Sequence, residues 1–196
     1  MYFFQIDTSK FGSQPEKFFD MLMDKWLHCF QDIAKKSGKN IFIGHSLGAL
    51  LAIELAERLK NAQAQEPNQL ILANCFPINM RDMYIRPMLY EQSLTELIQS
   101  INFDKYLNLS LDDTMKLFKQ KIELCLELLR HEKFSNSIST TIPVSLYYSK
   151  ADPLWAEWQQ DEWSKYSKLA AIEISGDHFA IAQHWELVVQ NIIGLK

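Results

Sequence analysis

The sequence predicts one α/β domain built on a mainly parallel sheet, and three observations carry this prediction. Short β-prone runs alternate with helical segments, as they do when helices cover both faces of a parallel sheet. The run at 40–43 is short and apolar, which is typical of a strand buried inside such a sheet. A chain of 196 residues with 47% apolar residues is large enough for one substantial core. We therefore expect a single domain over 1–196.

Each element follows from a local pattern. Further strands are predicted at Tyr2–Ile6, Gln69–Ala73, Val144–Tyr148 and Ala171–Ile174. Pro15 suits a first helical position and opens an amphipathic helix that is predicted to run to Lys36. Two more helices are predicted at Leu47–Lys60 and Ala180–Ile193.

A long helical stretch, Ile78–Ser139, interrupts the alternation of strands and helices. Within it, Leu111–His131 is strongly amphipathic. Two neighbouring strands need a much shorter connection, so an insertion of this size is either a lid or a satellite subdomain, and we expect a lid over the sheet. Its apolar residues must be covered by other parts of the chain, and the ones we expect against the sheet are Leu117, Phe118, Leu124 and Leu128.

Composition excludes several classes of function. The net charge of −4 gives no electrostatic reason to expect nucleic acid or an anionic membrane as a partner. No apolar run is long enough to span a bilayer, and Met1–Asp7 lacks the features of a signal peptide, so we expect a cytoplasmic protein. The three cysteines have no metal-ligand spacing and are expected to be small core residues. No metal site is expected.

A G-x-S-x-G motif at Gly44–Gly48 follows the apolar strand and opens the next helix. In that context Ser46 stands on a strained turn, and the glycines on either side let the backbone pass closely. The N–H of Leu47, at the helix N-terminus, is placed to stabilise an oxyanion. The motif therefore predicts a nucleophilic Ser46, with Leu47 contributing to the oxyanion hole.

A nucleophilic serine needs a base, and the base needs an acceptor that orients it. His178 follows the last predicted strand directly, so its loop can reach over Ser46. Asp152 follows the strand at 144–148, which is a natural place for the acid, whereas Asp177 is expected to be a turn residue. The other histidines are expected to be packed or surface residues: His28, His45, His131 and His184.

These residues resemble the thioesterase domains of non-ribosomal peptide and polyketide synthases, and their free-standing type II relatives, which have the α/β-hydrolase fold. Gly44–Ala49 is similar to their nucleophile elbow, and Ile172–Phe179 is similar to their last strand and histidine loop. Phe4–Ser13 resembles the strand and loop before the nucleophile, and Trp155–Trp163 resembles a tryptophan-bearing helix of the family. The resemblance covers nearly the whole chain.

Two features depart from the family pattern. In synthase-embedded members the acid usually follows the strand after the nucleophile helix, where this chain has Asn74, whereas Asp152 matches the acid of free-standing members. Both positions therefore stay open for the group that orients His178. The family also has a strand and helix before the strand at Tyr2, with a loop that supplies a second oxyanion N–H. We expect an N-terminally shortened domain, and loss of one such donor typically costs ~100- to 1,000-fold in turnover.

The resemblance implies a serine thioesterase that needs no cofactor. It would hydrolyse or release acyl or peptidyl thioesters carried on the phosphopantetheine arm of a carrier protein, through an acyl-serine intermediate. Two alternatives stay open: a general carboxylesterase or lipase using Ser46, Asp152 and His178, and a catalytically impaired domain without the N-terminal oxyanion loop. The acyl group and the oligomeric state are not indicated by the sequence.

Overall fold

A parallel sheet lies at the centre of the fold. The computed structural model describes residues 15–35, 38–88, 91–101, 110–130, 141–166 and 168–194. Within them, the strands lie side by side in chain order: β1 (Ile41–His45), β2 (Gln69–Ala73), β3 (Val144–Tyr148) and β4 (Leu169–Glu173). β2 and β3 have the predicted bounds, and β4 begins and ends slightly earlier than predicted. The strand predicted at Tyr2–Ile6 lies outside the described residues.

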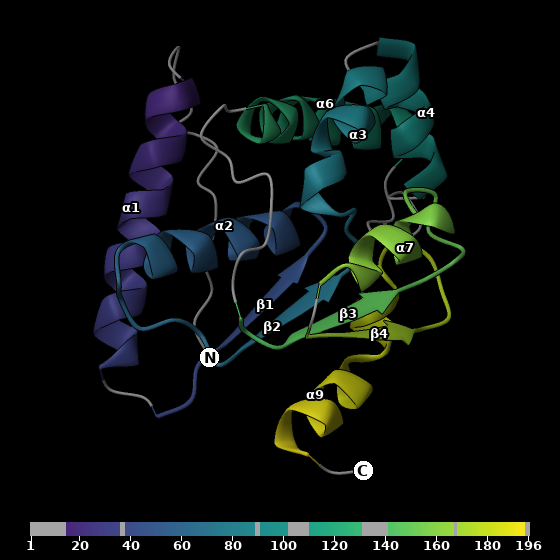
Figure 1. Cartoon of the computed structure of the whole chain (residues 1–196). Coiled ribbons are helices and arrows are strands. Elements are labelled where there is room, and N and C mark those ends of the chain that lie inside the picture. Colours follow the sequence, from purple (N-terminus) through teal and green to yellow (C-terminus); the bar gives the residue numbers. More distant parts are fainter. Residues whose placement is uncertain are drawn as a thin grey trace.

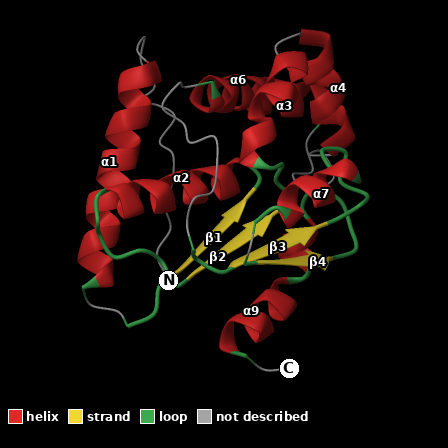
Figure 2. Cartoon of the chain, viewed as in Figure 1, coloured by secondary structure: helices red, strands yellow, loops and turns green. Residues whose placement is uncertain are grey.

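Two helices cover one face of the sheet (Figure 2). α2 (Leu47–Asn61) packs directly on β1 and β2, and α1 (Pro15–Ala34) packs on α2. The apolar stripe of α1 that the sequence predicted is buried, with Phe19 and Met23 fully inaccessible. The Phe30 ring meets the Phe42 ring of β1 edge to face, with centroids 4.7 Å apart. Burial of each large apolar side chain contributes about 1.5–3 kcal/mol, which is why this stripe docks the helix.

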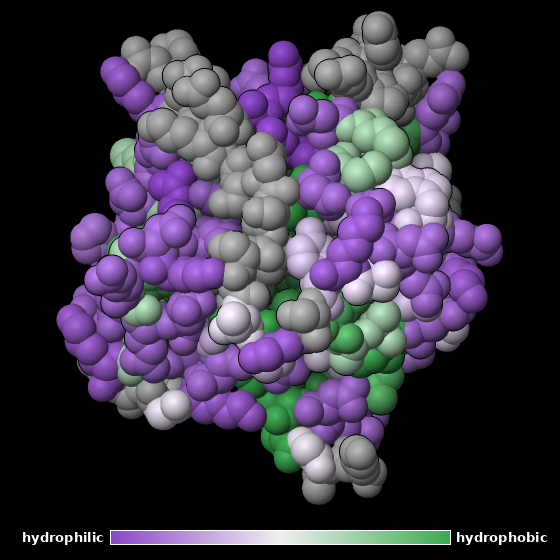
Figure 3. Space-filling view, in the orientation of Figure 1, coloured by the Kyte–Doolittle hydropathy of each residue, from purple (hydrophilic) through white to green (hydrophobic). Residues whose placement is uncertain are grey.

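The opposite face is covered by two short helices where one was predicted. α8 (Ala180–Gln183) and α9 (Trp185–Ile193) are separated at His184, whose φ of −108° and ψ of 23° are not helical. The His184 Nε2 lies 2.8 Å from the Ser175 carbonyl oxygen, a contact that holds this residue out of the helix. Val188 of α9 is buried against the sheet, and Figure 3 shows apolar surface beside this helix.

The insertion predicted as a lid is helical where it is described. It contains η2 (Ile78–Met80), α3 (Arg81–Met88), α4 (Glu91–Ile101) and α6 (Leu111–Leu129). In Figure 1 the strand arrowheads point toward the side on which α3 and α4 lie. α6 packs against α1, α3 and α4, and Leu128 is buried in the same core as α1 and α2. The side chains of Leu117, Phe118 and Leu124 lie outside the described residues.

The tryptophans of the stretch that resembles the family's tryptophan-bearing helix lie in and before α7 (Trp158–Ser164). Trp163 is fully buried, and Trp155 stacks on Tyr148 with ring centroids 4.3 Å apart. Trp158 is 37% exposed, so only part of its ring is covered.

The cysteine prediction was only partly right. Cys75 is buried, but Cys29 is exposed on α1, and the side chain of Cys125 is not among the described ones. Of the helices in the described part of the chain, none is both long and apolar enough to cross a membrane.

Candidate active site

Ser46 occupies the turn between β1 and α2. β1 ends at His45 and α2 begins at Leu47, so the chain reverses direction at this one residue. Its φ of 54° and ψ of −124° lie in a region that non-glycine residues rarely adopt, which costs about 1–3 kcal/mol. A hydrogen bond from the Ser46 N–H to the Ala73 carbonyl, 2.9 Å long, holds the turn against the end of β2. The Ser46 side chain does not cap α2, and Leu47, as the first helical residue, has no acceptor for its N–H within the helix.

The two glycines of the motif meet different surroundings. A Cβ at Gly44 would lie 2.4 Å from the Gly48 carbonyl oxygen and 2.5 Å from the Ala49 Cα, so the strand and helix approach too closely for any side chain. A Cβ at Gly48 would meet no described atom within 4 Å. Close backbone passage therefore requires glycine at Gly44, whereas no atom of the described residues requires it at Gly48.

His178 and Asp152 form a buried pair at the carboxyl edge of the sheet. The His178 Nδ1 donates to the Asp152 Oδ2 over 2.9 Å, and each residue is 3% exposed. Asp152 follows β3, and its Oδ1 accepts the Leu154 N–H at 2.9 Å in a local turn. With Nδ1 donating, the His178 Nε2 is left as the basic nitrogen of the neutral ring.

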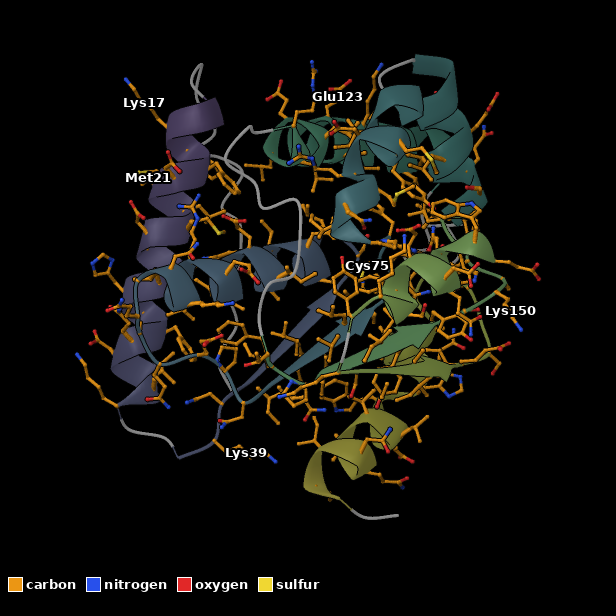
Figure 4. All side chains as sticks on the ribbon, in the orientation of Figure 1. Lys17, Met21, Lys39, Cys75, Glu123 and Lys150 are labelled. Atoms are coloured by element: carbon orange, nitrogen blue, oxygen red, sulfur yellow. The ribbon has the colours of Figure 1, made fainter. Side chains whose placement is uncertain are left out.

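Asn74 also contacts this pair. It directly follows β2, and its Nδ2 donates to the Asp152 Oδ2 over 2.8 Å. Asn74, the alternative to Asp152 as the group that orients His178, thus contacts Asp152, and Asp152 contacts His178. Cys75 and Lys150, labelled in Figure 4, follow β2 and β3 and mark the edge of the sheet where this network lies.

His45, which the sequence predicted to be a packed or surface residue, connects the position before Ser46 to the histidine loop. The His45 Nε2 donates to the His178 backbone carbonyl over 2.7 Å, and the two rings lie 4.8 Å apart. Burial, and then the proximity of His178, lower the pKa of His45 from 6.5 to about 4, so the ring is neutral at physiological pH. No sequence motif indicates this contact, because it joins residues 133 positions apart.

Hydrogen bonds before and after His178 hold the loop that carries it. The Ser149 hydroxyl donates to the Gly176 carbonyl, and Gly176 has a φ of 121°, which favours glycine. The Asp177 Oδ1 accepts the Phe179 N–H at 3.0 Å, an arrangement typical of a turn residue.

Among the described residues no hydrogen bond joins the Ser46 hydroxyl to His178. In enzymes without bound ligand, such catalytic hydrogen bonds are often long and tighten only in the complex.

The other histidines are placed away from this pair or are not described. His28 is exposed on α1 and contacts the Asp24 carbonyl at 2.7 Å. His184 contacts Ser175 between α8 and α9. His131 lies outside the described residues.

The family model of the thioesterase domain matches this chain over residues 1–195. The comparison with curated protein sequences found no match.

Several solved structures have the same fold. ClbQ from the colibactin NRPS/PKS pathway has a TM-score of 0.63 and 23% identity, over 87% of this chain and 74% of that one. The type II thioesterase BorB from the borrelidin biosynthetic cluster has a TM-score of 0.61 and 15% identity, over 88% and 72%. Human thioesterase 2 has a TM-score of 0.61 and 16% identity, over 88% and 79%. The predicted α/β-hydrolase fold is confirmed.

Proposed function

Because the chain belongs to the thioesterase-domain family and is therefore a hydrolase, we propose that it cleaves acyl or peptidyl thioesters through an acyl-Ser46 intermediate. The observation that carries the mechanism is the buried hydrogen bond between the His178 Nδ1 and the Asp152 Oδ2. A second observation supports the mechanism. The hydrogen bond from His45 to the His178 carbonyl holds the histidine loop next to the residue that precedes Ser46.

The proposed reaction has two steps. The Ser46 hydroxyl attacks the thioester carbonyl while the His178 Nε2 takes the serine proton. His178 then gives this proton to the departing thiolate, so that a thiol leaves and an ester on Ser46 remains. Water attacks this ester with His178 as base, and the proton returns to the Ser46 oxygen as the carboxylic acid is released.

Asp152 and Leu47 assist both steps without forming covalent bonds. Asp152 holds the His178 ring with its Nε2 toward the substrate and stabilises the imidazolium that forms. The Leu47 N–H, at the positive end of the α2 dipole, stabilises the oxyanion of each tetrahedral intermediate.

A carrier-protein phosphopantetheine thioester is the proposed substrate. The support is the likeness to ClbQ from an NRPS/PKS pathway and to the type II thioesterase BorB from a biosynthetic cluster. We therefore expect the same acyl group to be hydrolysed faster from a loaded carrier protein than from a small thiol. Equal or faster turnover of the matching oxygen ester would instead indicate a general carboxylesterase.

The test of the mechanism is Ser46→Ala. Intact-protein mass spectrometry after incubation with an acyl thioester should show a single acyl adduct on the unmodified protein and none on the variant. Turnover should fall on the order of 10⁶-fold, since the serine is the bond-forming atom. Ser164→Ala, which changes an exposed serine of α7, is the matched control and should acylate normally. An adduct that persists in Ser46→Ala would remove Ser46 from the mechanism.

A further inference from the structure

The two polar side-chain atoms of Asn74 are used unequally. Its Nδ2 donates to the Asp152 Oδ2 over 2.8 Å, while its Oδ1 has no hydrogen-bond partner among the described residues. Asn74 is 3% exposed, so this amide oxygen is buried. A buried polar atom without a partner is destabilising, and a residue kept only for packing would avoid it. The hydrogen bond that the Asn74 Nδ2 donates to Asp152 is therefore the interaction that explains an asparagine at this position.

That donor meets the same carboxylate oxygen that binds His178. The Asp152 Oδ2 accepts from the His178 Nδ1 at 2.9 Å and from the Asn74 Nδ2 at 2.8 Å. A third donor, the Leu154 N–H, donates to the other carboxylate oxygen, Oδ1, and belongs to the same turn as Asp152, so it would move with it. Asn74 instead belongs to the end of β2, and its own N–H donates to the Tyr147 carbonyl of β3 at 3.0 Å. Asn74 is thus the contact that fixes the carboxylate relative to the sheet.

We propose that Asn74 is a positioning residue, which sets the rotation of the Asp152 carboxylate so that one oxygen faces His178. This inference rests on the proposed function, because it assigns Asn74 a part in orienting the base. Without the amide, the carboxylate keeps the Leu154 N–H of its own turn and the His178 Nδ1, but no contact fixes it relative to the end of β2. A small misplacement of catalytic groups lowers the rate rather than substrate binding.

A backbone role for Asn74 can be separated from this one. Its φ of 47° lies in the left-handed region, which asparagine tolerates better than most residues. Glycine adopts the same φ without strain, so Asn74→Gly keeps the backbone conformation and removes the whole side chain, including the amide. Asn74→Asp keeps the shape of the side chain and replaces the donor with a second carboxylate beside Asp152.

The kinetic test uses the full chain and a soluble acyl thioester. Asn74→Gly should lower kcat about 10- to 100-fold with KM unchanged, and Asn74→Asp should lower it at least as much. In an Asp152→Ala background, Asn74→Gly should have no further effect, because the two residues act as one unit. Wild-type kcat in Asn74→Gly, or an equal loss in both backgrounds, would overturn the inference.

A second readout does not depend on turnover. The buried His178 Nδ1–H should give a downfield proton resonance, assigned by its absence in His178→Gln. Asn74→Gly should shift or broaden it, and an unchanged resonance would overturn the inference whatever the kinetics. If the unmodified protein hydrolyses no thioester, or if Ser46→Ala keeps full activity, the proposed function fails while this resonance still decides the role of Asn74.

Discussion

Gly44 and Gly48 lie at equal distances from Ser46 in the motif, but only one of them is enclosed by backbone atoms. The atoms that a Cβ at Gly44 would meet are the Gly48 carbonyl and the Ala49 backbone, which cannot move without displacing the start of α2. Gly48 lies inside α2 and is exposed.

We expect Gly44→Ala to destabilise the protein and Gly48→Ala not to. Gly44→Ala should lower the free energy of unfolding by more than about 3 kcal/mol or prevent folding, because overpacking here cannot relax. Gly48→Ala should be neutral or up to about 1 kcal/mol more stable, because alanine favours the helix. Urea unfolding of both variants measures this. Equal destabilisation would show that the backbone near Ser46 is constrained at both glycines.

The helical insertion is attached to the sheet domain at both ends. At its start, Tyr84 of α3 stacks on Phe76 with centroids 4.4 Å apart and accepts a hydrogen bond from Gln159. Burial, helped by the charge of Asp152, raises the pKa of Tyr84, so its hydroxyl stays protonated. At its end, Leu128 and Leu129 of α6 are buried in the main core. Motion of the whole insertion as one lid would break both attachments.

We therefore expect that opening and closing of the insertion over the Ser46 site involves only α4 and the first turns of α6. Hydrogen exchange should be slow throughout α3 and the last turn of α6, and faster in 91–101. Acylation of Ser46 should slow exchange in 91–101 if this helix closes over the acyl group. Tyr84→Phe keeps the ring and removes the hydroxyl, so it should speed exchange in 81–88 and leave α1 unchanged. Exchange in 91–101 as slow as in the strands, and unaffected by acylation, would make the insertion a rigid layer.

At the scale of the whole molecule, one apolar core joins α1, α2, the sheet and α6. The bond between His45 and His178 adds a link between the first strand and the last loop. We propose on this basis that the chain unfolds as a single domain, with tryptophan fluorescence and circular dichroism giving the same midpoint.

Acid should weaken the whole fold through His45. Its pKa is about 4 in the folded state and near 6.5 when unfolded, so the unfolded chain binds the extra proton as pH falls. The stabilisation is complete above pH 6.5 and is lost progressively toward pH 4, on the order of 3 kcal/mol in all. His45→Gln retains an N–H donor for the His178 carbonyl but does not titrate. The difference in unfolding free energy between the two proteins should change by this amount between pH 7.5 and pH 4, and a constant difference would contradict it.

Local patterns were sufficient to predict most of the sheet and the elbow. The bounds of β2 and β3, the amphipathic α1 and the strained turn at Ser46 all follow from periodicity, turn chemistry and one motif. These features depend on residues that are close in sequence, so their pattern is visible without the fold. The break between α8 and α9 was missed because a contact from His184 to Ser175, outside the helix itself, interrupts it.

The arrangement around His178 was decided by tertiary structure. The sequence offered Asp152 and Asn74 as alternatives, whereas the folded chain places the two side chains in contact with each other and only Asp152 in contact with His178. That arrangement depends on the register of β2 with β3, in which Ala73 lies opposite Tyr147 and brings the loops after both strands together. Local propensity cannot specify it, because a hydrogen bond between side chains 78 positions apart depends on how the strands pair and not on the residues beside either one.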